Sequence, residues 1–226
     1  MQYHIQTTPI WDAFKEPCDC PVCKLYERVE NRLLKQYLEE AVMEPDYRVK
    51  VNKRGFCSNH LRKLYTGGNK LGLALQVHTR TDNIIAHIPT VSNARAAKRL
   101  ADKLEKGLET CVICDEADEV MERYAYTIAE MYANEPEFPA LFDKTNGFCL
   151  PHFILLLRYV SHAGKKAEAY VKSLCRRQTD GMRKLTNELE RFTRRFDYRS
   201  TDKVAHGNND ALSRAINKIK GNIVKD

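Results

Sequence analysis

The feature that most constrains this chain is a pattern of cysteine and histidine pairs that occurs twice. Cys20-Pro-Val-Cys23 recurs 91 residues later as Cys111-Val-Ile-Cys114. Gly55-Phe-Cys-Ser-Asn-His60 recurs 92 residues later as Gly147-Phe-Cys-Leu-Pro-His152. A Glu-Pro-acidic tripeptide between these anchors also recurs, again 91 residues apart. Three anchors in register indicate an internal duplication.

This pattern predicts metal binding. Both side chains of a Cys-x-x-Cys pair can reach one ion, and zinc takes four nitrogen and sulfur ligands in a tetrahedron. A Cys-x-x-His pair at the start of a helix places its two side chains on one face. We therefore expect two zinc ions per chain, each in a Cys₃His site. The predicted ligands are Cys20, Cys23, Cys57, His60, Cys111, Cys114, Cys149 and His152.

Four ligand pairs can form two sites in three ways, and the sequence favours pairing within each copy of the repeat. Pairing across the copies would join Cys20 and Cys23 to Cys149 and His152, and would also give two Cys₃His sites. Pairing like with like would give one Cys₄ and one Cys₂His₂ site. Both alternatives stay open.

Other uses of the eight cysteines were weighed against zinc. No secretory signal or spanning segment is visible, so a cytoplasmic location is the default, and disulfides are uncommon there. A redox dithiol is disfavoured because no βαβ pattern accompanies it. An iron–sulfur cluster in a sensor protein stays open, since Cys₃His sets also bind clusters. Cys18 has no counterpart in the second copy, and Cys175 is expected in a helix core.

The hydrophobic spacing predicts an all-α protein. Helices are expected after each Cys-x-x-Cys pair, up to a proline at 45 or 136, and from each Gly-Phe-Cys onward. Further helices are expected over 71–88, 93–108 and 165–196, the last interrupted near Asp180-Gly181. The stretch 3–10 could have an extended backbone conformation. The predicted organisation is two tandem pseudo-symmetric helical repeats, over 1–90 and 91–196, each with a Cys₃His zinc site. A tail follows over 197–226, and its short closing helix is expected to have Asp210 as N-cap.

The positive charge is concentrated in a basic C-terminal helical segment. Residues 165–226 hold 16 Lys and Arg against 8 Asp and Glu, whereas the whole chain has a net charge of +7. Such a segment could bind nucleic acid, although a solvated helix face is the simpler interpretation. The candidate nucleic-acid-binding residues are Arg176, Arg177, Arg191, Arg194 and Arg195.

Nucleotide-binding loops, nucleophile elbows and zincin or deaminase motifs were not found in the sequence. A zinc-binding scaffold that contacts a protein or nucleic acid is therefore the favoured function. A metal or redox sensor and an uncharacterised metalloenzyme are the alternatives.

The chain resembles an uncharacterised family of bacterial proteins that is known only as a domain of unknown function. The resemblance implies a common architecture and supplies no activity. The matching stretches are Tyr3-His4, Thr8–Ala13, Cys20–Cys23, Met43–Pro45, Gly55–Cys57 with His60, Leu71–Leu73, Cys111 with Ile113-Cys114, Gly147–Phe153, Arg195–Arg199 and Asp210–Leu212.

Overall fold

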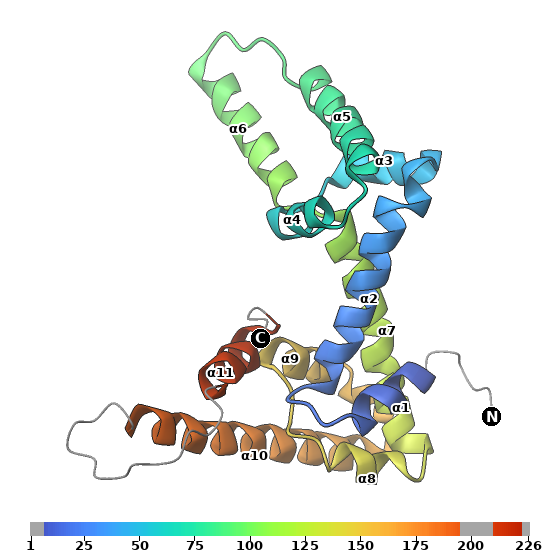
Figure 1. Ribbon diagram of the computed structural model, residues 1–226, viewed down its shortest axis with the longest axis vertical. Helices are drawn as coiled ribbons and strands as arrows, with labels where there is room; N and C mark the ends of the chain where they lie inside the picture. The colour runs from blue at the N-terminus through green and yellow to red at the C-terminus, as the bar shows by residue number, and fades with distance from the viewer. Residues whose placement is uncertain (1–6, 195–209, 223–226) are drawn as a thin grey trace. The chain divides into compact units, whose positions relative to one another are not determined.

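The computed structural model describes residues 7–194 and 210–222, and all regular structure in these two ranges is helical, as predicted (Figure 1). Short 3₁₀ segments lie at Glu40–Val42 and Val160–Lys166. The α-helices are α1 (Thr7–Lys15), α2 (Pro21–Leu38), α3 (Pro45–Arg54), α4 (Ser58–Thr66), α5 (Lys70–Ala86), α6 (Ala94–Leu108), α7 (Val112–Asn134), α8 (Phe138–Phe142), α9 (Leu150–Arg158), α10 (Ala167–Arg194) and α11 (Ala211–Lys220).

The chain divides into two compact units that alternate along the sequence. Unit 1 contains residues 1–27 and 121–226, and unit 2 contains residues 28–120. Both boundaries lie inside helices, one in α2 and one in α7, so each of these helices contributes to both units.

An aromatic cluster forms the core of unit 1. Phe142 of α8 is fully buried, and its ring centroid lies 5.8 Å from that of Phe14 and 5.5 Å from that of Tyr170. Phe148 joins the cluster at 5.4 Å from Phe142. Because Phe148 directly precedes Cys149, burying its ring fixes the position of a predicted metal ligand.

Tyr37 of α2 organises the corresponding region of unit 2. Its side chain is fully buried, and the ring of Phe56 packs edge-on against it with a centroid distance of 5.7 Å. The Tyr37 hydroxyl donates to a carboxylate oxygen of Glu116 on α7. Phe56 precedes Cys57, so the phenylalanine of each Gly-Phe-Cys motif anchors the cysteine that follows it.

Several local predictions need correction. α2 ends at Leu38, and Pro45 begins α3 instead of ending a longer helix, because proline fits the first turn of a helix. Residues 7–10 are helical, not extended, while residues 3–6 and 197–209 lie outside the described ranges. The closing helix α11 is present, but the Asp210 side chain makes no capping hydrogen bond.

Gly181 does not interrupt α10, which runs unbroken through it. A Cβ atom added to Gly181 would lie 2.0 Å from the carbonyl oxygen of Asn146. The glycine is therefore needed because the backbone before the second Gly-Phe-Cys motif approaches the helix directly. None of the helices in the described ranges has the length and apolar character that crossing a bilayer requires.

The close approach of Asn146 to Gly181 predicts whether a Gly→Ala substitution in a helix raises or lowers the stability of the fold. In an open helix, Gly→Ala stabilises by up to about 1 kcal/mol. Gly107→Ala in α6, where the nearest atom to an added Cβ is 4.0 Å away, should stabilise in this way. Gly181→Ala should instead destabilise the fold by about 1–3 kcal/mol, because it overpacks a close contact. Denaturant unfolding of both variants measures this, and equal stabilisation by both would contradict the contact.

Candidate metal centres

The eight predicted ligands form two groups of four, one in each unit. Within each group, the ligand atoms all lie within 4.8 Å of one another. We call the group in unit 1 site 1 and the group in unit 2 site 2. Site 1 contains Cys20, Cys23, Cys149 and His152, and site 2 contains Cys57, His60, Cys111 and Cys114.

The structure corrects the expected pairing, because each site combines a Cys-x-x-Cys pair from one copy with a Cys-x-x-His pair from the other. The reason is the helix that follows each Cys-x-x-Cys pair. α2 has 18 residues and α7 has 23, which correspond to lengths of about 27 and 35 Å. Each helix takes the chain into the other unit before the next ligand pair is reached. Consequently, the two ligand pairs of one copy belong to different units.

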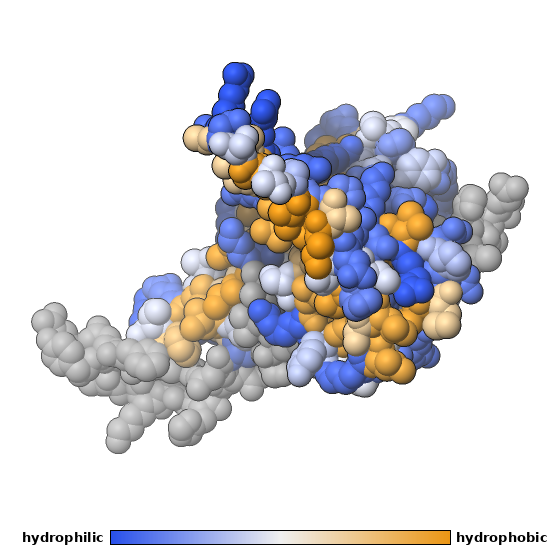
Figure 2. Space-filling view, turned by 90° about the horizontal axis from the view of Figure 1, so that it is seen from above, coloured by the Kyte–Doolittle hydropathy of each residue, from blue (hydrophilic) through white to orange (hydrophobic). Residues whose placement is uncertain are grey.

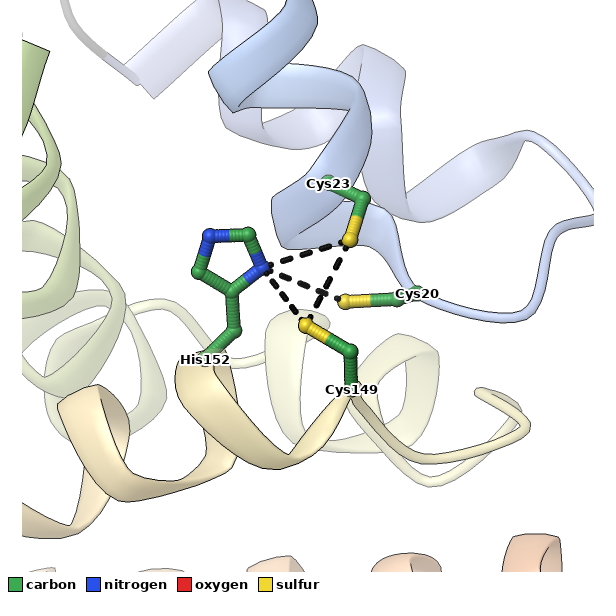
Figure 3. Close-up of side chains that lie close together, drawn as sticks. All are labelled: Cys20, Cys23, Cys149 and His152. Atoms are coloured by element: carbon green, nitrogen blue, oxygen red, sulfur yellow. Dashed lines mark hydrogen bonds between the residues drawn. The ribbon is translucent and has the colours of Figure 1, made fainter. Parts of the chain in front are cut away.

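The ligand atoms of site 1 point toward one common centre (Figure 3). Nδ1 of His152 lies 3.1 Å from Sγ of Cys149 and 3.3 Å from Sγ of Cys23. The sulfurs of Cys23 and Cys149 are 3.5 Å apart. Metal–sulfur bonds of about 2.3 Å in a tetrahedron give sulfur–sulfur edges of about 3.8 Å. These separations therefore fit four ligands around one ion.

Site 2 has the same arrangement. Nδ1 of His60 lies 3.2 Å from Sγ of Cys111, 3.3 Å from Sγ of Cys57 and 3.4 Å from Sγ of Cys114. The sulfurs of Cys57 and Cys114 are 3.9 Å apart. Both groups can hold a metal ion through three thiolates and the Nδ1 atom of one histidine.

The glycine before each Cys-x-x-His pair makes this geometry possible. Gly55 has φ of 66° and Gly147 has φ of 79°, a region that other residues rarely adopt. After this turn, Cys57 and Cys149 occupy the N-cap positions of α4 and α9. Thiolates are favoured at helix N-termini by the free N–H groups and the helix dipole.

Hydrogen bonds among the ligands favour the thiolate form of one cysteine in each site. In site 2, a hydrogen bond with Cys114 lowers the pKa of Cys111. In site 1, hydrogen bonds with Cys20 and Cys23 lower the pKa of Cys149. The remaining thiols must lose their protons when the ion binds, so metal affinity must fall at low pH.

The histidine of site 2 has a carboxylate partner that the sequence analysis missed. Nε2 of His60 lies 3.1 Å from Oε1 of Glu30, and Lys63 Nζ donates to the same oxygen at 2.5 Å. Although burial opposes it, hydrogen bonds from His60 and Lys63 lower the pKa of Glu30 to about 2. Glu30 thus stays ionised at neutral pH and fixes the ring orientation of His60, as carboxylates do at many metal sites. Its position on α2, seven residues after Cys23, gave no sequence signal.

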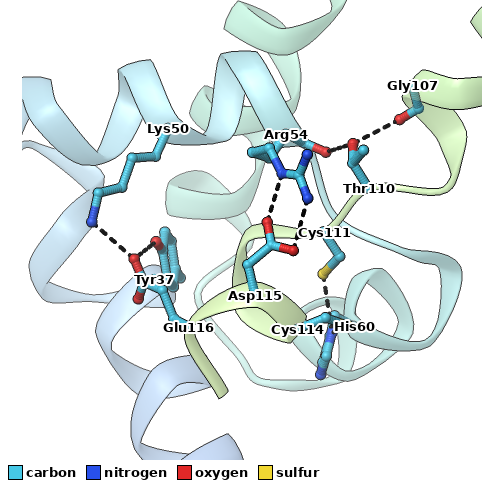
Figure 4. Close-up of polar contacts among 10 residues, drawn as sticks. All are labelled: Tyr37, Lys50, Arg54, His60, Gly107, Thr110, Cys111, Cys114, Asp115 and Glu116. Atoms are coloured by element: carbon cyan, nitrogen blue, oxygen red, sulfur yellow. Dashed lines mark hydrogen bonds and ion pairs between the residues drawn. The ribbon is translucent and has the colours of Figure 1, made fainter. Parts of the chain in front are cut away.

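Ion pairs around site 2 join α3 to the start of α7 (Figure 4). Arg54 makes two hydrogen bonds to the carboxylate of Asp115, at 2.6 and 2.8 Å. Lys50 donates to Glu116 at 2.9 Å. Asp115 and Glu116 directly follow Cys114, so these contacts hold the ligand-bearing first turn of α7 against the end of α3.

The comparisons with known proteins agree with the resemblance seen in the sequence. The chain belongs to a family of unknown function, DUF6062, which matches residues 1–226. It is also similar to an uncharacterized 23.9 kDa protein in the xynA 3′ region of Caldicellulosiruptor sp. (strain Rt8B.4). The two are 25% identical over 189 residues, which cover 84% of this chain and 87% of the relative. No solved structure matches the chain.

The other candidate residues are not members of either group of four. Arg176 pairs with Asp143, Arg177 with Asp180 and Arg194 with Glu190. Arg191 is exposed on α10, and Arg195 lies outside the described ranges. Cys175 is exposed and not in a core, whereas Cys18 is partly buried two residues before Cys20. Burial raises the pKa of Cys18 to about 11.

Double substitutions test the pairing across copies. Cys20→Ser with Cys149→Ser removes two ligands from site 1 only, so one of two bound metal ions should remain. Cys20→Ser with Cys57→Ser removes one ligand from each site and should lower the affinity of both. Metal content after dialysis against a competing chelator distinguishes them. Retention of one ion by the second variant, together with loss of both by the first, would contradict this pairing.

Proposed function

We propose that this chain is a helical binding module with two structural zinc ions. Each ion stabilises one unit from within. The observation that carries the proposal is that each site already has four protein ligands. Catalytic zinc sites keep a coordination position for water or substrate, whereas structural sites are filled by protein side chains. Two complete Cys₃His sets therefore favour a structural role over a metalloenzyme.

The spacing of the ligand atoms favours single zinc ions over iron–sulfur clusters. The ligands of a cluster bind different iron atoms, so they stand farther apart than ligands that share one ion. In both sites the ligand atoms lie within 4.8 Å of one another. Three thiolates and one imidazole are a set that zinc commonly takes.

The binding role is supported by helix α6. None of its residues is buried, although one side of the helix is entirely apolar. Leu104 is 37% exposed and Leu108 is 80% exposed. A 15-residue helix is only marginally stable in water without packing of its apolar face. An exposed apolar face of this kind is typical of a surface that binds a partner.

The neighbouring helix α5 extends the apolar surface. α5 and α6 both belong to unit 2 and are joined by residues 87–93, and we call the two helices the α5–α6 hairpin (Figure 1). On α5 and the connection, Ile85 is 63% exposed and Ile88 is 50% exposed. Figure 2, which views the molecule from above relative to Figure 1, shows apolar side chains at the surface among hydrophilic ones.

The charge of α6 indicates what kind of protein it binds. Its polar side carries five Lys and Arg residues and two acidic residues. A second copy of the same basic helix would be repelled, whereas an acidic amphipathic helix would match both the apolar side and the charge. We therefore favour an acidic protein segment as the partner of the α5–α6 hairpin.

Nucleic acid is the second candidate partner, through the arginines of α10. Three of the four described candidates already pair with acidic side chains. Such pairs reduce the charge available to phosphates, since the gain from binding comes from neutralising unpaired positive charge. The α10 surface therefore supports nucleic-acid binding less well than the hairpin supports protein binding.

The zinc proposal predicts the composition and stability of the purified protein. We expect two zinc ions per chain and no visible absorption, measured by elemental analysis and spectroscopy. A strong chelator should lower Tm by about 10 °C or more, because structural zinc contributes several kcal/mol and about 1 kcal/mol corresponds to 2–4 °C in a chain of this size. Iron, visible colour or an unchanged Tm would contradict the proposal.

The binding proposal is tested by comparing two surface variants in cells. Leu104→Gln with Leu108→Gln should abolish crosslinking to an acidic protein, while Arg191→Glu with Arg194→Glu should leave it unchanged. In vitro, binding to mixed oligonucleotides is measured across salt concentrations. If the arginine variant loses the interaction and the leucine variant keeps it, the binding surface is α10 and not the hairpin. If salt-dependent oligonucleotide binding dominates, the partner is nucleic acid and not an acidic protein.

A further inference from the structure

The C-terminal helix α11 supplies a buried lysine to site 1. The side chain of Lys218 is 3% exposed. Its Nζ donates to the carbonyl oxygen of Asp19 at 2.5 Å and to that of Asn146 at 2.7 Å. Asp19 directly precedes Cys20, and Asn146 directly precedes the Gly147-Phe-Cys149 turn. One ammonium group thus connects the two segments that carry the ligands of site 1.

A second basic residue holds α11 in this position. Arg214 donates to both carboxylate oxygens of Asp19, at 2.7 and 2.9 Å, and to Glu188 of α10 at 2.6 Å. Between the two basic residues, Ala215 is buried, and α11 contacts α9 and α10. The small alanine side chain lets the helix lie close to its neighbours.

Site 2 connects its ligand segments without a remote helix. The backbone N–H of Val112 donates to the carbonyl oxygen of Gly55 at 3.0 Å. The hydroxyl of Thr110 also donates to the carbonyl of Arg54. Both donors lie next to Cys111, and both acceptors lie directly before Phe56-Cys57. The connection in site 2 therefore comes from the ligand segments themselves.

Site 1 cannot form the same backbone connection. The residue that corresponds to Val112 in the first copy is Pro21, 91 residues earlier. Proline has no N–H group, so it cannot donate to the carbonyl of Gly147. Asp19 corresponds to Thr110 and brings a carboxylate in place of the hydroxyl donor. Lys218 supplies the donor that these two differences remove.

The charge and surroundings of site 1 also differ from those of site 2. Three thiolates and a neutral imidazole around a divalent ion leave a net charge of −1, which the nearby ammonium of Lys218 balances. The sulfurs of site 1 belong to residues that line a cavity of about 220 Å³. The cavity lining includes Cys18, Cys20, Cys23, Cys149, Arg214 and Lys218.

We propose that Lys218 is the positioning residue of site 1, and that site 1 is the exchangeable metal site of the chain while site 2 retains its ion. This inference rests on the proposed binding of two zinc ions. Local opening of a single helix costs less free energy than global unfolding. When α11 opens, site 1 loses the ammonium bridge between Asp19 and Asn146 and keeps the longer hydrogen bond from the Asn146 amide to the carbonyl of Cys18, at 3.3 Å, whereas the connections of site 2 remain.

The test is pulsed alkylation of full-length, zinc-loaded protein with N-ethylmaleimide in the presence of EDTA, with labelled cysteines identified by mass spectrometry. In the parent chain, Cys20, Cys23 and Cys149 should react about 10-fold faster than Cys57, Cys111 and Cys114. Lys218→Met should accelerate labelling of site 1 alone, by about 10–100-fold, with unchanged helical circular dichroism. The exposed Cys175 serves as the internal standard for thiol reactivity.

Glu30→Gln is the matched control, because it removes the carboxylate partner of His60 and should accelerate labelling of site 2 alone. Should Lys218→Met fail to fold, Arg214→Gln provides the same test with a smaller expected acceleration at site 1. Equal labelling of both sites in the parent, or equal acceleration of both by the α11 variants, would overturn the inference. Zinc content below two ions before alkylation would instead refute the proposed function on which it rests.

Discussion

The structure depends on one constraint, which is that four side chains from two distant segments meet closely enough to hold a single ion. A Cys-x-x-Cys pair at the start of α2 or α7 supplies half of the ligands, and the turn before α4 or α9 supplies the other half. The half-buried ring of Phe56 and the fully buried ring of Phe148 fix these turns from the inside. The ligand geometry and the aromatic cores are therefore built from the same short motifs.

The duplicated sequence produces two sites with the same ligands and different surroundings. In site 2, the carboxylate of Glu30 orients the histidine, and the segment before Cys111 leads directly from the end of α6. An ion bound in site 2 would consequently hold the base of the α5–α6 hairpin, on which the proposed binding surface lies. In site 1, basic residues of α11 take the role that local backbone contacts have in site 2. Under the proposal, an ion in site 2 supports the structure and an ion in site 1 exchanges.

The sequence was sufficient for the fold class and for the eight residues that form the two groups of four, because ligand spacing and helical periodicity are local signals. It was not sufficient for the pairing, since that depends on where α2 and α7 lead the chain. Gly181 resembled a helix break because the atom that requires it, the carbonyl oxygen of Asn146, is 35 residues away. Glu30 and Lys218 carry no motif, and their roles come entirely from tertiary contacts.

The most direct measurement of the central claim is X-ray absorption at the metal edge of the protein as purified. One ion per site in a Cys₃His shell predicts zinc with an average of three sulfur neighbours at about 2.3 Å and one nitrogen neighbour at about 2.0 Å. It also predicts no metal–metal scattering. A shell dominated by oxygen or nitrogen, or a short metal–metal distance, would contradict the account.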